Sequence, residues 1–279
     1  MSWTVVARKD FDDARRSRTL WALSAVFLGL AVLVSGVYGY VPDLSGAERR
    51  STVGLLGFLA SPVTLFVSVA ALVACHKSIA GETETGSGKL LLGLAHTRRD
   101  VFVGKVVGRS LVLALPVLAG LAAMLVVVFA AGVPFSPTDY VLFTLVTLFF
   151  VLVYVTVFVG VSASTTSTSR AATVGVLLLV VFEFAWDVVP LGAWFVASGF
   201  EVPEGFATGN LAAMPDRVAF LNNVPPSGAY QIAIGGVFSG SMSSAEPFYL
   251  QQWFGIVILV VWALVPAVIG YLRYQRADL

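Results

Sequence analysis

Long runs of apolar residues alternate with polar intervals along most of this chain. A helix needs roughly 20 apolar residues to cross the hydrocarbon core of a bilayer, and six runs approach that length. The pattern therefore predicts an all-α polytopic membrane protein with six transmembrane helices, forming a single transmembrane domain over residues 1–279. The expected spans are residues 20–40, 53–74, 110–132, 140–161, 172–194 and 254–272.

The first polar interval, residues 1–19, has apolar residues at helical spacing with basic residues between them. This distribution is typical of an amphipathic helix that lies in the membrane interface, so we expect an N-terminal interfacial helix here. Its apolar positions are Trp3, Val6, Ala7, Phe11 and Ala14.

The last interval, residues 198–253, is the longest and contains several prolines. A structureless loop of this length is uncommon in a compact protein. We therefore expect a loop that folds back on the membrane as short helices.

The distribution of lysine and arginine predicts the orientation. The two ends of the chain, the interval 75–109 and the Ser-rich turn at 162–170 hold fourteen basic residues, whereas the opposite intervals hold three. Cytoplasmic loops of membrane proteins carry such an excess. We expect a multi-pass protein of the cell membrane with both termini in the cytoplasm, so that the interval 198–253 is external.

The interval 75–109 carries the most basic residues of any polar interval, six in all. In its first half Glu82 and Glu84 precede Gly86, and glycine commonly ends a helix. The sequence thus predicts a short helix and a turn directly after the second span.

The second half of this interval combines apolar and capping residues. Leu91 and Leu94 belong to a short apolar ridge. Thr97 and Asp100 have the spacing at which a hydroxyl and a carboxylate satisfy the free N–H groups of a helix start. A new helix is therefore expected to begin near Arg98 and to continue into the third span.

At these residues the chain resembles the first cytoplasmic loop of type-two ABC exporter permeases, the membrane subunits of ATP-binding-cassette transporters. The shared order is an acidic pair before a glycine, a short Leu-rich helix, a basic helix start, and Gly-Lys at the foot of a span. The matching residues are Glu82, Glu84, Gly86, Leu91, Arg98, Gly104 and Lys105.

The resemblance implies a cytoplasmic coupling helix that docks on a separate ATPase chain. Glu82 and Glu84 would pair with basic residues of that ATPase, while Leu91 and Leu94 would fill an apolar cleft in it. It also implies an assembly of two permeases and two ATPases, with substrate contacts along the interface between the permeases. The simpler interpretation is a solvated loop with snorkelling basic side chains.

Composition narrows the function further. The chain is 58% hydrophobic and 12% charged, with a net charge of +1, which excludes a nucleic-acid binder that relies on a large basic surface. A single cysteine cannot form an intramolecular disulfide, and two histidines with four methionines predict no metal site. We expect no cofactor.

Recognisable catalytic motifs are absent from the sequence. It contains no Gly-x-x-x-x-Gly-Lys-Ser/Thr phosphate loop, no His-Glu-x-x-His and no nucleophile elbow. We therefore expect a non-enzymatic subunit that takes its energy from a partner. The alternatives are an ion-coupled carrier and a membrane anchor that recruits a cytosolic protein.

Glu183 and Asp187 are the acidic residues inside an apolar run, in the outer half of the expected fifth span. Residues four apart share a helix face, so both are expected on one side of that span. They either form a polar face near the outer headgroups or line the transport pathway. The ion-coupled alternative would use the same two residues.

Overall fold

A computed structural model describes residues 3–41, 51–86, 97–202, 214–239 and 247–276. Six helical segments within these ranges are long and apolar enough to cross a membrane, which confirms the predicted all-α polytopic class. These segments contain the helices α2 (Arg18–Tyr40), α4 (Thr52–Cys75), α7 (Arg98–Ala130), α8 (Pro137–Ala163), α9 (Thr168–Val180, continued by η1 over Val181–Ala185) and α14 (Gln252–Arg276).

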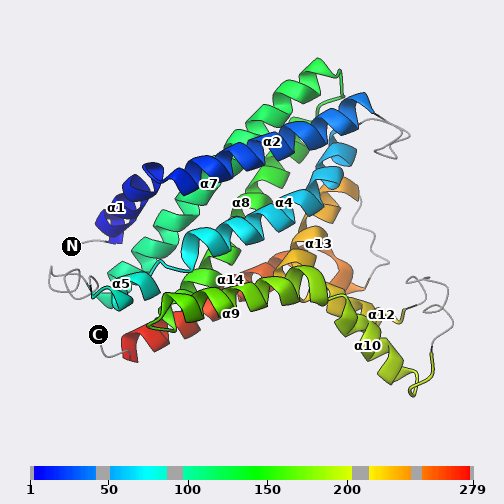
Figure 1. The fold of residues 1–279 in the computed structure, drawn as a ribbon. Helices are drawn as coiled ribbons and strands as arrows, with labels where there is room; N and C mark the ends of the chain where they lie inside the picture. Colours follow the sequence, from blue (N-terminus) through cyan, green and yellow to red (C-terminus); the bar gives the residue numbers. More distant parts are fainter. Residues whose placement is uncertain (1–2, 42–50, 87–96, 203–213, 240–246, 277–279) are drawn as a thin grey trace.

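Shorter helices connect or flank these six. Two of them are α1 (Trp3–Arg15) and α5 (Ala80–Glu84). They lie on the side of the bundle that holds both ends of the chain (Figure 1), and we call this side the terminal end. The remaining ones are η1 (Val181–Ala185), α10 (Val188–Ala197), α12 (Asp216–Ala219), η3 (Phe220–Asn223), α13 (Pro226–Ser239) and η4 (Phe248–Leu250).

Helix α8 is the centre of the bundle, in contact with α4, α7, α13 and α14. Its aromatic side chains Phe143, Phe150, Tyr154 and Phe158 are almost completely buried. Close crossings in a membrane depend on small residues, because lipid supplies no hydrophobic force between helices. Gly160 and Gly270 make such a crossing of α8 and α14, where a Cβ on Gly270 would lie 2.5 Å from the Gly160 Cα.

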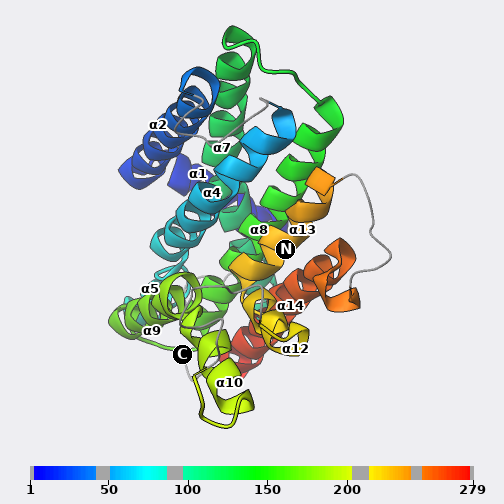
Figure 2. The same ribbon diagram turned by 90° about the vertical axis from the view of Figure 1, so that its right-hand side faces the viewer.

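The interval after the fifth span contains short helices, as predicted. Helix α13 penetrates the bundle beside α14 and α8 (Figure 2). Ala229, Tyr230, Ala233 and Ile234 on this helix are nearly inaccessible to solvent. The hydroxyls of Tyr230 and Thr147 on α8 are hydrogen-bonded at 2.8 Å, so α13 belongs to the core of the structure and does not merely cover it.

The fifth apolar segment covers Thr168–Ala185, so it ends earlier than the predicted span over residues 172–194. Helix α9 passes into the π-helical segment η1, which contains Glu183, and a turn at Trp186 and Asp187 follows. Helix α10 then leaves in a new direction (Figure 1). Glu183 lies in the π-helical segment and Asp187 in the turn after it, so the two residues are not on one regular helix as expected. Glu183 is half-buried and Asp187 is exposed.

Candidate functional site at the terminal end

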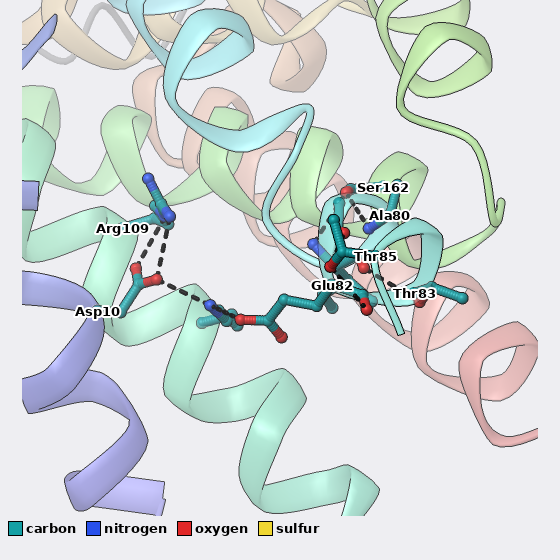
Figure 3. Close-up of polar contacts among 10 residues, drawn as sticks. Asp10, Ala80, Glu82, Thr83, Thr85, Arg109 and Ser162 are labelled. Carbon is teal, nitrogen blue, oxygen red and sulfur yellow. Dashed lines mark hydrogen bonds and ion pairs between the residues drawn. The ribbon is translucent and has the colours of Figure 1, made fainter. Parts of the chain in front are cut away.

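The end of α8 fixes the start of α5. The Ser162 hydroxyl accepts hydrogen bonds from the backbone N–H groups of Ile79 (3.1 Å) and Ala80 (3.0 Å) and donates one to the His76 carbonyl oxygen (2.9 Å). The first N–H groups of a helix have no partner within the helix, so this one side chain both caps α5 and joins it to α8 (Figure 3). The turn between α4 and α5 is thereby held against the bundle.

A chain of buried charges joins α5 to α7 and α1 (Figure 3). The Glu82 carboxylate lies 2.6 Å from the Lys105 Nζ, which lies 3.0 Å from the Asp10 Oδ1. The Arg109 Nε lies 2.8 Å from the Asp10 Oδ2. The Asp10 side chain is only 3% exposed and that of Lys105 only 9%. Charges at this depth are costly unless they are paired, so each stabilises the placement of the others.

Two glycines on α7 let α1 approach closely enough to make these pairs. A Cβ on Gly104 would lie 2.6 Å from the Val6 Cβ, and one on Gly108 would lie 3.1 Å from the Ala7 carbonyl oxygen. The distance at Gly104 is shorter than the contacts that real Cβ atoms make, so an alanine there would push α1 away. The spacing of four residues places both glycines on one face of α7, where they form a groove for α1. The N-terminal helix thus packs on α7 through the face that carries Asp10.

Glu84 joins α5 to the start of α9. Its Oε2 accepts a hydrogen bond from the backbone N–H of Thr168 at 3.0 Å, the first residue of α9. A carboxylate at a helix N-terminus is favoured by the helix dipole and by the unpaired N–H groups there. Glu84 therefore fixes the beginning of the fifth span.

The predicted start of α7 is confirmed. Thr97 and Asp100 form a reciprocal capping box, and the helix begins at Arg98. The Arg98 guanidinium donates to the carbonyl oxygens of Tyr274 (2.6 Å) and Gln275 (2.8 Å) near the end of α14. A cation at a helix C-terminus satisfies carbonyls that lack partners within the helix. Arg98 thus joins the start of α7 to the sixth span.

Gly86 ends α5 with a φ of +74°, a conformation that glycine adopts at low cost, as its position in the sequence predicts. Leu91 and Leu94 belong to residues 87–96, which lie outside the described residues. The structure therefore places the two roots of this segment, residues 80–86 and 97–109, but not the segment itself.

The two acidic residues of the predicted coupling loop, Glu82 and Glu84, have partners within the chain itself. Glu82 contacts Lys105 and Glu84 contacts the backbone of Thr168. The expectation that both carboxylates pair with a partner protein does not account for these contacts. Their observed contacts instead fix α5 relative to α7 and α9.

Glu183 and Asp187, the acidic residues predicted in the fifth span, lie far from the terminal end. Glu183 accepts a hydrogen bond from the Tyr154 hydroxyl of α8. Ser227 of α13 donates to the Phe182 carbonyl oxygen at 3.3 Å. Asp187 is exposed in the turn before α10, so the structure does not bring the two acidic residues into one site.

The described residues offer no metal site, because they contain no group of three or more His, Cys, Asp or Glu side chains that could hold an ion. The charges at the terminal end are paired with one another. These pairs join α1, α5 and α7 to one another.

Sequence reasoning missed Asp10 and Ser162. Asp10 occupies the same helical face as Val6, Ala7 and Ala14, and an acidic residue on the apolar face of an amphipathic helix was the signal for a buried partner. Ser162 begins a run of hydroxyl residues interpreted as a turn. Nothing local distinguishes its role from that of its neighbours, because its partners lie more than eighty positions away.

Comparison with known proteins agrees with this geometry. A family model described as ABC-2 family transporter protein matches residues 4–279. The chain is 27% identical over 270 residues to the protein named "Probable ABC transporter permease protein NosY" of Stutzerimonas stutzeri, covering 95% of this chain and 92% of the relative. A protein of the same name from Pseudomonas aeruginosa is 32% identical over 129 residues, which is 46% of each chain.

The chain belongs to the ABC-2 family of transporter proteins. It is a permease, the membrane subunit of an ABC transporter, and its family implies an ATPase partner. Six apolar helical segments place it in a membrane as a multi-pass protein.

Proposed function

We propose that this chain is the permease of an ATP-driven exporter whose ATPase is a separate, cytoplasmic chain that docks on segment 87–96. The observation that carries the proposal is the anchoring of both roots of this segment. Its first root is bonded to α8, α9 and α7 through Ser162, Thr168 and Lys105, and its second root to α14 through Arg98.

This anchoring gives a route from the ATPase to the membrane. Closure of the ATPase on nucleotide would push segment 87–96, and its roots would carry the displacement to the helices bonded to them. Lys105 and Asp10 extend the same connection to α1. Glu82, Glu84, Arg98 and Lys105 then act as positioning residues, while the ridge containing Leu91 and Leu94 supplies the apolar contact. ATP hydrolysis takes place on the partner.

Two copies of the permease with two ATPases would form the working unit, since one set of six spans provides half of a pathway in the exporters that the chain resembles. The interface between the copies would hold the substrate path. In this arrangement the terminal end is cytoplasmic and α10, α12 and η3 lie outside the cell, consistent with the positive charge gathered near the termini.

Co-purification tests the proposed partnership. When the permease is co-expressed with an ABC ATPase from its own organism, we expect the cognate ATPase to form a stable complex containing two copies of each chain. We also expect the ATPase to hydrolyse ATP faster in the complex than alone, because the permease aligns the two ATPase copies. A permease that transports in liposomes without any ATPase would contradict the proposal, as would a partner that binds no nucleotide.

Thiol labelling tests the proposed orientation. Thr85 follows α5, Glu201 follows α10, and both residues are exposed. The two helices lie toward opposite ends of the bundle (Figure 1). In a Cys75→Ala background, Glu201→Cys is expected to react with a membrane-impermeant maleimide in intact cells, whereas Thr85→Cys is expected to react only after the membrane is opened. Labelling of Thr85→Cys from outside would invert the orientation.

A further inference from the structure

A second polar cluster lies within the spans, away from the terminal end. Glu183 of η1 accepts a hydrogen bond from Tyr154 of α8 and interacts with the side chain of Ser68 on α4. Tyr154 also interacts with the side chain of Ser227 on α13, whose hydroxyl donates to the Phe182 carbonyl oxygen. Four elements of the bundle thus meet around one carboxyl group.

The backbone at this point is irregular. Residues Val181–Ala185 form a π-helical turn, a rare conformation that is frequent at functional sites. The carbonyl oxygen of Phe182 lies in this turn and is the acceptor for Ser227. The irregular turn is therefore one contact of α13 besides its packing on α14, α8 and α4, and it supplies both the carboxyl and the carbonyl groups of the cluster.

No ion pair among the described residues includes Glu183. The three ion pairs among the described residues all lie at the terminal end. The groups that face Glu183 are hydroxyls, one each from α4 and α8, and α14 contributes Trp262 packed on Phe182 at 5.0 Å between ring centres. An ionised side chain within a span is costly unless it is paired. Gain of a proton removes that cost.

Protonation would also reverse a hydrogen bond. An ionised carboxylate only accepts, so the Tyr154 hydroxyl donates to it; a neutral carboxyl group carries its own O–H and can donate to Tyr154 instead. The Tyr154 proton is then available to the Ser227 oxygen. The Ser227 hydroxyl is the group that attaches α13 to η1, so the change at Glu183 reaches α13 in two steps.

We propose that Glu183 is a proton-binding site, and that Tyr154 and Ser227 pass its protonation state to α13. The ligand is a proton taken up from water, which converts the carboxylate to a neutral carboxyl group with no other bond made or broken. The consequence is a change in how tightly α13 is held in the bundle. Asp187, which is exposed outside the cluster, takes no part.

Two measurements on the full permease in lipid nanodiscs test this inference, and neither requires the ATPase. Infrared titration follows the carbonyl stretch of a protonated carboxyl group as the pH is raised. The labelling rate of Gln231→Cys in a Cys75→Ala background, corrected at each pH for the fraction of thiolate, reports on α13, where Gln231 is exposed. We expect the band to disappear and the labelling rate to change severalfold with the same midpoint.

Variants separate the steps of the relay. Glu183→Gln is expected to lose both the titrating band and the pH dependence of labelling. Tyr154→Phe and Ser227→Ala are expected to keep the infrared band and to lose the pH dependence of labelling. If Glu183→Gln does not fold, these two variants test the relay in its place. Asp187→Asn is the matched control and is expected to titrate as the unaltered protein does.

Three results would each overturn the inference. These are a labelling rate that is the same at every pH, a pH dependence that persists in Glu183→Gln or Tyr154→Phe, and loss of the response in Asp187→Asn. Because no readout involves nucleotide, these failures would leave the proposed ATPase partnership standing. Conversely, failure of the permease to bind an ATPase would leave the titration unaffected.

Discussion

Replacing Asp10 with alanine is expected to detach α1 from the bundle and to lower the thermal stability of the permease sharply. The change leaves Lys105 and Arg109 without the carboxylate that they share. Removing one partner of a buried ion pair costs about 3–5 kcal/mol. The cost here falls mainly on Arg109, because Lys105 keeps its pair with Glu82. The measurement is the midpoint of thermal unfolding in nanodiscs.

Asp13→Ala is the matched control for this prediction. It removes the same charge from the same helix at an exposed position, so its midpoint is expected to stay close to that of the unaltered protein. Lys105→Met should have a smaller effect in the Asp10→Ala background than alone, because residues in one network are not additive. Equal midpoints for Asp10→Ala and Asp13→Ala would show that the buried charges do not hold α1.

Replacing Leu91 with glutamate is expected to abolish stimulation of the partner ATPase while the permease itself remains folded. A central apolar anchor of a protein interface is worth about 2 kcal/mol or more, and a charge placed in its pocket costs still more. Since about 1.4 kcal/mol corresponds to a tenfold change in affinity, the expected loss of ATPase binding exceeds tenfold. The measurement is ATP hydrolysis by the partner as a function of permease concentration.

Leu91→Met is the control for the docking prediction, because methionine keeps the volume and apolar character of leucine. It should stimulate the ATPase nearly as well as the unaltered permease. The thermal midpoint of Leu91→Glu should also be unchanged. Full stimulation by a folded Leu91→Glu permease would show that the ATPase docks elsewhere.

The features that the sequence predicted well depend on local patterns. Six apolar runs define the long helices because their length alone meets the requirement of a bilayer. Thr97, Asp100 and Gly86 mark helix ends because capping is decided within a few residues of the chain. These interactions need no knowledge of the tertiary structure.

The features that it did not predict depend on distant partners. The sequence predicted the short helix that contains Glu82 and Glu84. Their contacts with Lys105 and the start of α9 could not be predicted, because these contacts arise only when the helices pack. The π-helical segment before the break is contacted by Tyr154 and Ser227, whereas the apolar pattern of the span continues through the break. Periodicity reports which residues avoid water, not where a helix changes direction.

Site-specific photocrosslinking from position 91 tests the docking of the ATPase on this permease most directly. A photoreactive amino acid is placed at Leu91 in the co-expressed complex, and a second complex carries it at Glu201 as the control for the opposite end. We predict a covalent adduct between permease and ATPase from position 91 and none from position 201. An intact complex of the two chains that gives no adduct from position 91, or gives one from position 201, would contradict the account.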